Sequence, residues 1–253
     1  MKKLLIFAMS MMIIIIIGLV ICKKMIKKQS VRDTILKVIA LLTITLHYSS
    51  LWVDYLQEGV ATVDGTMLFM IYPCNICMWM LLVVAFINDK KCFFGKVMIE
   101  FLAITGTICG MIGLFANEIF ISNPSFSNYD SLKGLLSHST MIFGTLYLLT
   151  QGYVKIETIS MTVSTILGLL FFLLDGVIIN KVFAIFGLPE VNAMYLLRFP
   201  IVKPFCNTVT LGLIGVNILF VFLTIYETLV YKQEERWYYK LKLTKIKDKE
   251  NKE

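Results

Sequence analysis

Hydrophobic residues along this chain fall into long blocks separated by short polar segments, a pattern typical of membrane-spanning helices. Seven blocks cover residues 4–22, 35–52, 67–87, 97–114, 135–149, 159–179 and 205–226. A helix needs about 17–25 mostly apolar residues to cross the hydrocarbon core, and only the fifth block is shorter than this. We therefore predict an all-α membrane protein, a bundle of about seven transmembrane helices, or six if the fifth block does not cross.

The composition agrees with this class. Hydrophobic residues make up 58% of the 253 residues, charged residues 16%, and the mean hydropathy is +0.79, so most of the chain lies in lipid. We expect a multi-pass protein of the cell membrane. Lys2 and Lys3 precede the first block, as in a signal peptide, but the block lacks a small-residue cleavage site and is predicted to be retained as the first span.

The net charge of +7 indicates orientation rather than nucleic-acid binding. Residues 23–37 carry six Lys or Arg, residues 88–96 carry three and residues 232–253 carry eight, whereas residues 53–66 carry none. Cytoplasmic loops are enriched in Lys and Arg, so this alternation predicts an amino terminus outside the cell and a cytoplasmic carboxyl terminus. We expect membrane lipids, and no nucleic acid, as partners.

The chain divides into three parts: an amino-terminal helix with its basic loop (1–30), a helical core (31–231) and a basic tail (232–253). Residues 236–242 mix aromatic and basic side chains, which suits either a helix lying on anionic lipid or an unstructured tail. Within the core, Gly106, Gly110 and Gly113 form a small-residue face, which predicts close packing of another helix.

Several polar side chains inside the blocks share one predicted depth. At a rise of about 1.5 Å per residue, five of them lie in the outer half of the bilayer: His47, Cys74, Cys77, His138 and Asp175. Polar side chains are costly in hydrocarbon, so a set at one level predicts a functional cavity. Glu100, by contrast, lies at an inner span end, where its carboxylate is expected to reach the interface.

The segment around Pro73 adds geometry to this level. Proline removes a backbone donor and is expected to kink the third helix, so that polar groups such as Asn75 gather near the freed carbonyls. Cys74 and Cys77, three residues apart, share a helical face.

Residues 187–200 form the other unusual segment. They are too apolar for an ordinary solvated loop and carry one cation, Arg198, on the side where cations are scarce. We expect a re-entrant or interfacial cap in which Arg198 binds a phosphate or carboxylate. The alternative is a surface turn anchored to lipid headgroups.

Three of these segments resemble a known family. Tyr-Pro-Cys-Asn-Ile-Cys at 72–77, Ser-His at 137–138 and Asn-x-x-Tyr-x-x-Arg-x-Pro at 192–200 are similar to stretches of YwaF-type bacterial integral membrane proteins. Those proteins are similar in turn to the animal transmembrane protein 164. The resemblance covers about residues 35–226 and implies a lipid acyltransferase with a Cys and a His in its membrane core, or a related lipid hydrolase. Most bacterial members have no assigned activity.

Carried over to this chain, the resemblance makes Cys74 the nucleophile and His138 the general base, with Cys77 as the counterpart of the bacterial cysteine. Asn75 stands where the bacterial pattern has a His, which weakens a metal site there. The supporting residues are expected to be Asn75 at the oxyanion, Asp175 orienting the base, Cys77 and His47; the substrate-binding residues are Asn192, Tyr195 and Arg198. No metal and no cofactor is expected.

Two other functions remain open on the residues alone. A membrane thiol-disulfide oxidoreductase would use Cys74 and Cys77 as a redox pair with Cys206 as exchange partner. A transporter or lipid-binding protein without enzymatic activity would use His47, His138 and Asp175 to relay protons or bind a headgroup.

Overall fold

The computed structural model describes residues 2–49, 51–53, 69–122, 125–198 and 207–242, and within these ranges the regular structure is entirely helical. The helices are α1 (Lys2–Met25), α2 (Gln29–Tyr48), α4 (Pro73–Phe86), α5 (Phe93–Phe101), α6 (Thr107–Phe115), α7 (Glu118–Ser122), α8 (Tyr129–Thr150), α9 (Thr158–Ile185) and α10 (Thr208–Val230). A π-helical turn, Leu102–Gly106, joins α5 to α6. The predicted all-α class is confirmed, and each of the seven predicted blocks contains a helix.

Four stretches of the described chain are long and apolar enough to cross a membrane: α1, α9, α10 and the run Phe93–Ser122, which includes α5, α6 and α7. This makes the protein a multi-pass membrane protein. The other three predicted blocks hold helices that do not meet both criteria. α4 has only 14 residues, while α2 and α8 have 20 and 22 residues but carry more polar side chains.

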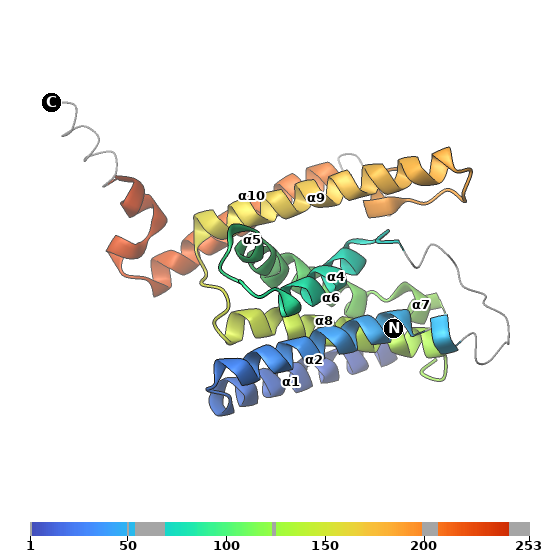
Figure 1. Cartoon of the computed structure of the whole chain (residues 1–253), viewed down its shortest axis with the longest axis horizontal. Coiled ribbons are helices and arrows are strands. Elements are labelled where there is room, and N and C mark those ends of the chain that lie inside the picture. Colours follow the sequence, from blue (N-terminus) through green and yellow to red (C-terminus); the bar gives the residue numbers. More distant parts are fainter. Residues whose placement is uncertain (1, 50, 54–68, 123–124, 199–206, 243–253) are drawn as a thin grey trace.

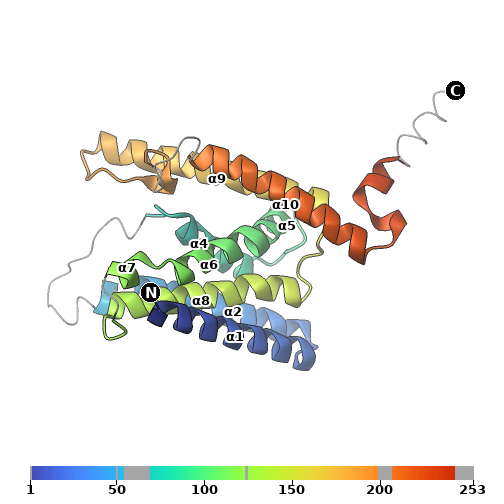
Figure 2. The same cartoon turned by 180° about the vertical axis from the view of Figure 1, so that it is seen from behind.

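The helices form three layers, which both cartoon views show (Figures 1 and 2). α9 and α10 run side by side along one face, α4, α5 and α6 lie in the middle, and α1, α2 and α8 make up the opposite face. α8 packs against α1, α2 and α6, and α9 packs against α5 and α10. The outer layers turn bulky apolar side chains outward, including Ile14 and Ile17 of α1 and Leu213 and Phe222 of α10. Such a surface suits lipid rather than water.

The predicted small-residue face is confirmed as the contact between α6 and α8. A Cβ added at Gly106 would lie 2.7 Å from the Thr145 side chain, and one at Gly110 would lie 2.6 Å from Ile142. Gly113 is tighter still, because its Cβ would lie 2.0 Å from the ring of His138. Glycine at these positions lets the two backbones approach closely.

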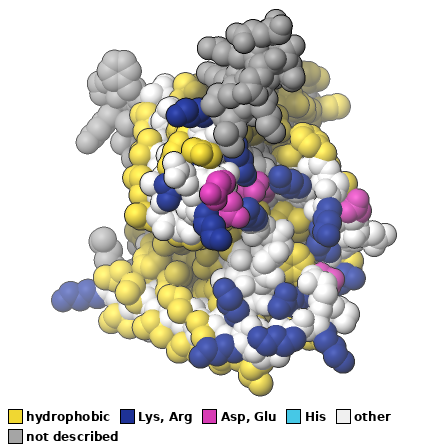
Figure 3. All heavy atoms as spheres, turned by 90° about the vertical axis from the view of Figure 1, so that its left-hand side faces the viewer, with side chains coloured by type: hydrophobic (Ala, Val, Ile, Leu, Met, Phe, Trp, Pro, Cys, Tyr) yellow, Lys and Arg dark blue, Asp and Glu magenta, His cyan; other side chains and the backbone are white. Residues whose placement is uncertain are grey.

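Basic side chains gather at one end of the bundle, the left-hand end in Figure 1, which faces the viewer in Figure 3. The turns that follow α1, α4 and α8 meet there. Arg32 holds two of them together, since its guanidinium donates to the carbonyls of Ile26 and Gln151 at 3.2 Å.

The first part of the tail is folded against α10. Residues 237–242 are helical, and the buried carboxylate of Glu227 accepts hydrogen bonds from the backbone N–H groups of Thr158 and Trp237. The indole of Trp237 donates to Thr224 Oγ1 at 3.2 Å and its ring lies 5.3 Å from that of Phe220. One carboxylate thus joins the start of α9, the end of α10 and the tail.

Candidate functional site

His138 is held in one orientation by its own helix. α8 begins after Asn128, whose side chain accepts a hydrogen bond from Ser131 N, so the helix starts well before the apolar block. The His138 Nδ1 lies 2.7 Å from the carbonyl oxygen of Gly134. A carbonyl can only accept, so Nδ1 carries the proton, and in the neutral ring Nε2 has the free electron pair. Within the described residues Nε2 has no hydrogen-bond partner, and the Nε2–Cδ2 edge of the ring packs on Gly113 of α6.

Three cysteine thiols cluster between α4 and α6. Cys109 of α6 lies within electrostatic range of both Cys77 and Cys74. All three are free thiols. Cys77 is completely buried, whereas Cys74 is partly exposed and donates to Asn75 Oδ1 at 3.4 Å. Cys109 is also partly exposed, so its complete burial sets Cys77 apart from the other two.

Pro73 begins α4 instead of kinking it, which corrects the sequence expectation. The helix starts with Tyr72 as its N-cap and Pro73 at its first position, where a missing N–H costs no hydrogen bond. Cys74 therefore sits in the first turn. The free N–H groups and the helix dipole there favour a negative charge, including that of a thiolate.

His47 lies closer to the site than a peripheral supporting residue would. It is within electrostatic range of both His138 and Lys133. Its ring packs edge-on against Tyr48, with 4.9 Å between centroids, and the Tyr48 hydroxyl accepts a hydrogen bond from Trp79 Nε1 at 2.8 Å. The end of α2 is thereby tied to α4 beside the histidines.

The predicted nucleophile, Cys74 of α4, and the predicted base, His138 of α8, lie on two helices that both pack against α6, and the structure does not join them directly. His138 packs on Gly113, and Cys109, an electrostatic neighbour of both thiols of α4, lies four residues earlier on α6, a rise of about 6 Å. No hydrogen bond links Cys74 or Cys77 to His138 within the described residues. We name this group of side chains, His47, Cys74, Cys77, Cys109 and His138, the histidine–thiol region.

Asp175 does not orient His138 in this structure. The Nδ1 position that such a carboxylate would bind is taken by the Gly134 carbonyl. Asp175 belongs to α9, in the opposite outer layer, and its Oδ2 is buried without a hydrogen-bond partner among the described residues. The neighbouring Gly176 packs against Met194 and Leu196.

The segment 193–196 covers the start of α4, close to Cys74. Met194 N donates to the carbonyl of Ile71 at 2.8 Å, and the rings of Tyr195 and Tyr72 have centroids 5.6 Å apart. Met194 and Tyr195 both have φ of 54°, a left-handed conformation that is unusual for residues other than glycine. Asn180 fixes this strained turn, because its Oδ1 accepts from Ala193 N at 2.9 Å.

Two of the expected substrate-binding residues make internal contacts. Asn192 closes the turn: its Oδ1 accepts from Leu197 N and Arg198 N, at 3.0 and 3.1 Å. The side chain of Arg198 is 81% exposed and pairs with Glu190 at 3.4 Å. Its charge is therefore at the surface of the cap and not buried beneath it.

Sequence reasoning missed Lys133 and Cys109. Lys133 is only 5% exposed, forms a 3.0 Å ion pair with Asp130 and lies near His47. The signal was present, since Asn128 followed by Asp130 is a typical start of a helix and extends α8 past Lys133. No signal in the sequence shows that Cys109 of α6 lies near Cys77 of α4.

Among the residues that the structure describes, no three His, Cys, Asp or Glu side chains are arranged to hold a metal ion.

In comparisons with known proteins, the model of the TMEM164 family matches residues 1–231. This confirms the resemblance inferred from the sequence. No curated protein and no solved structure matches the chain.

Proposed function

Because the chain belongs to the TMEM164 family, we propose that it is a membrane lipid acyltransferase, or the corresponding lipid hydrolase, with Cys74 as nucleophile and His138 as general base. One observation carries this proposal: His138 of α8 packs on Gly113 of α6, and Cys109, an electrostatic neighbour of Cys74, lies about one helical turn earlier on α6. The two groups need not touch in the absence of substrate, since catalytic hydrogen bonds often tighten only when substrate is bound.

The chemistry proceeds through a thioester. The Cys74 thiol gives its proton to Nε2 of His138, and the sulfur bonds to the carbonyl carbon of a lipid ester. Collapse of the tetrahedral intermediate breaks the carbon–oxygen bond, and the departing alkoxide takes the proton from His138. His138 then removes a proton from a lysolipid hydroxyl or from water, whose oxygen attacks the thioester. The carbon–sulfur bond breaks, and Cys74 recovers its proton.

The surroundings of Cys74 support its role over that of Cys77. Cys74 lies in the first turn of α4, where the helix dipole favours negative charge, and the side-chain amide of Asn75 is adjacent to the sulfur as a donor for the developing oxyanion. Cys77 is completely buried against Cys109. Ester carbonyls lie near the glycerol level of a bilayer, and the predicted depth of both Cys74 and His138 is in the outer half.

We further propose that all seven helical blocks cross the cell membrane, with the amino terminus outside and the carboxyl terminus in the cytoplasm. The gathering of Lys and Arg at one end of the bundle supports this orientation (Figure 3). In this arrangement α2, α4 and α8 are shielded from lipid in part by the more apolar α1, α9 and α10, which explains how they tolerate His47, Asn75 and His138.

The test is acyl exchange by purified protein in lipid nanodiscs supplied with a labelled phospholipid donor and a lysophospholipid acceptor. Cys74→Ala and His138→Ala should each lower turnover by at least about 100-fold, the usual contribution of a nucleophile or general base. Cys22→Ala, at the far end of α1, is the matched control and should retain activity. Equal turnover in the wild type and both site variants would refute the proposal.

A second function, thiol-disulfide exchange, is favoured by the contact between Cys77 and Cys109. It pairs thiols of two helices instead of the Cys74–Cys77 pair expected from the sequence, and Cys206 lies outside the described residues. The two functions differ in the thiol they need. Exchange of reducing equivalents with a small dithiol should depend on Cys109, whereas acyl exchange should depend on Cys74.

A further inference from the structure

α10 carries a polar side chain, that of Asn217, on its lipid-facing surface. The residue lies close to the middle of the helix, and its side chain is exposed. α10 is long and apolar enough to cross a membrane, and both cartoon views show it beside α9 in an outer layer of the bundle (Figures 1 and 2). Polar residues within spans almost always face other protein or a water-filled cavity, so an exposed asparagine indicates that a further partner packs there.

Asn217 is directed away from the helix on which α10 already packs. Gly212, Leu219 and Leu223 are residues of α10 that lie toward α9. At about 100° per residue, Asn217 lies roughly 120–160° around the helix from each of them. The contact between α10 and α9 therefore leaves the amide of Asn217 outside the bundle.

The Asn217 amide is only partly satisfied by its own helix. Its Nδ2 donates to the carbonyl of Leu213 at 2.8 Å. An amide has two N–H donors and an oxygen acceptor, so one N–H and the Oδ1 atom have no partner among the described residues. Hydrocarbon offers these groups no hydrogen bond, and leaving them unpaired there is costly.

The residues that share this face of α10 follow a heptad repeat. Positions spaced alternately by four and three residues hold only β-branched side chains and the asparagine: Thr210, Ile214, Asn217, Val221, Thr224 and Thr228. Trp237 of the tail donates a hydrogen bond to Thr224, so the open part of the repeat is Thr210, Ile214, Asn217 and Val221, which we call the α10 seam. Such a 3–4 repeat is the pattern by which two helices pack along a common line in a membrane.

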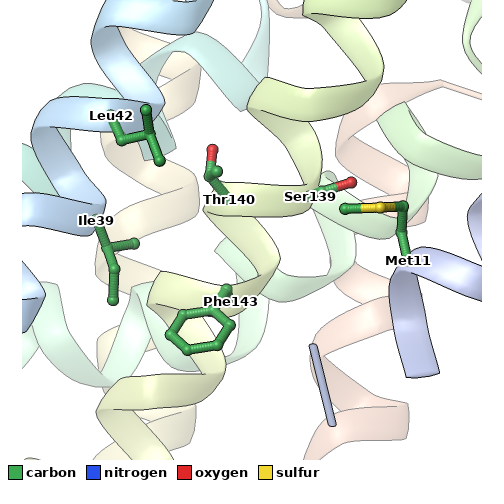
Figure 4. Close-up of a pocket in the computed structure, with 6 residues that line it drawn as sticks. All are labelled: Met11, Ile39, Leu42, Ser139, Thr140 and Phe143. Carbon is green, nitrogen blue, oxygen red and sulfur yellow. The ribbon is translucent and has the colours of Figure 1, made fainter. Parts of the chain in front are cut away.

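The opposite outer layer contains a cavity without this kind of signal. It lies between α1, α2 and α8, and its volume is about 220 Å³. Its lining residues, shown in Figure 4, are Met11, Ile39, Leu42, Ser139, Thr140 and Phe143. Both hydroxyls donate to carbonyls of α8. Apolar walls of this kind are satisfied by lipid alone, whereas the amide of Asn217 requires a partner with hydrogen-bonding groups.

A second copy of the chain meets this requirement. Copies inserted in one membrane share an orientation, so a two-fold axis along the membrane normal sets one α10 parallel to the other and each seam residue opposite its own counterpart. The remaining N–H of each Asn217 can then donate to the Oδ1 atom of the other, which gives two reciprocal hydrogen bonds. We infer that two copies of the chain associate through the α10 seam and that the pair of Asn217 amides holds them together. This inference is independent of the proposed catalytic function.

Reconstitution in liposomes that contain no other protein tests this association. Two populations of the full chain, labelled at the amino terminus with a donor or an acceptor dye, are mixed, and energy transfer is measured as lipid is added. We expect a monomer–dimer equilibrium. Asn217→Leu should raise the dissociation constant of the dimer roughly 5–30-fold, the contribution of one or two hydrogen bonds between membrane helices.

The control is Phe222→Leu, since Phe222 is exposed but lies about 140° around α10 from Asn217. It should leave the dissociation constant unchanged. Monomers at every ratio of protein to lipid would overturn the inference. So would equal dissociation constants for the wild type and Asn217→Leu.

A matched pair of cysteine variants tests the same contact with Asn217 intact. Val221 belongs to the α10 seam and its neighbour Phe222 does not, yet the two side chains are 56% and 64% exposed. Mild oxidation in the liposomes should join two copies of Val221→Cys through a disulfide and should give Phe222→Cys no more dimer than the native cysteines of the wild type. Equal dimer yields from the two variants would show that α10 has no preferred face for a second copy, and the inference would fall.

Discussion

Two polar regions inside the bundle differ in how their groups are bonded. The first, which we call the glutamate region, consists of Glu100 on α5, Ser160 and Ser164 on α9, and Lys96. The Glu100 carboxylate, 2% exposed, accepts hydrogen bonds from Ser160 at 2.9 Å and Ser164 at 2.7 Å, and pairs with Lys96 at 3.5 Å. In the histidine–thiol region, by contrast, His138 Nε2 has no hydrogen-bond partner among the described residues, and the Cys74 thiol has one weak bond.

This difference separates a structural role from a chemical one. A buried polar group whose bonds are all made contributes to holding helices together, and its removal leaves the partners unsatisfied. Polar groups in a membrane that lack partners are costly and are kept for binding or reaction. The glutamate region should therefore respond to substitution mainly in stability, and the histidine–thiol region mainly in activity.

The largest expected effect on stability is that of Glu100→Ala. Removing the carboxylate leaves both serine hydroxyls without their acceptor and Lys96 without its counter-charge, so we expect a loss of about 3 kcal/mol in the free energy of unfolding. The measurement is equilibrium unfolding in mixed detergent micelles. Glu190→Ala is the matched control, because Glu190 is 69% exposed and its pair with Arg198 should contribute less than about 1 kcal/mol. Equal effects of the two substitutions would contradict the assignment of a structural role to Glu100.

Glu100 also shows what the sequence could not predict. At the end of an apolar block its carboxylate was expected to reach the interface, yet it is buried. The pair with Lys96 is visible in the sequence as an i, i+4 spacing. The two serines, 60 and 64 residues away, become partners only because α9 packs on α5, and hydrophobic patterns do not specify which helices are neighbours.

The candidate site shows the same limit of prediction from the sequence. Hydropathy placed the helices, and depth selected His138 of α8 and Cys74 of α4 as candidates. Depth, however, gives only the position of a residue along the helix axis. Asp175 has the same predicted depth but belongs to α9 in another layer, and depth did not reveal that Cys109 lies near the thiols of α4. The direction in which each side chain faces depends on helix packing, which the hydrophobic pattern leaves open.

Gly113→Ala should lower both stability and activity. The added Cβ would lie 2.0 Å from the His138 ring, so either the ring or the α6–α8 contact must move. We expect a loss of about 1–3 kcal/mol in the free energy of unfolding, together with reduced acyl exchange. Gly215→Ala on α10 is the control: no other atom lies within 4 Å of its added Cβ, and alanine favours a helix. Unchanged acyl exchange in Gly113→Ala would show that the position of His138 on α6 does not matter to the reaction.

His47→Phe should lower acyl exchange with little loss of stability, whereas Glu100→Ala should mainly lower stability. No hydrogen bond to His47 is seen in the described residues, and a phenyl ring can keep the packing against Tyr48. The free energy of unfolding should therefore change by less than about 1 kcal/mol. Acyl exchange should fall, because the imidazole of His47, which lies within electrostatic range of His138, loses its polar atoms. A large loss of stability would place His47 with the structural groups and break the contrast between the two regions.

The smallest effect on stability is expected from oxidation, which tests the arrangement of the thiols. Diamide accepts two electrons and two protons from a thiol pair, and the contact between Cys77 and Cys109 predicts that it joins these two cysteines. Peptide mapping after alkylation should find one disulfide linking α4 to α6 and an alkylated Cys74. Cys109→Ala should prevent this disulfide, and Cys22→Ala should not. A disulfide between Cys74 and Cys77 would instead show that the pair expected from the sequence is correct.

Because Cys74 stays free, the oxidised protein should retain acyl exchange if Cys74 is the nucleophile. An oxidoreductase working through Cys109 should instead lose its exchange with small dithiols once Cys109 is replaced.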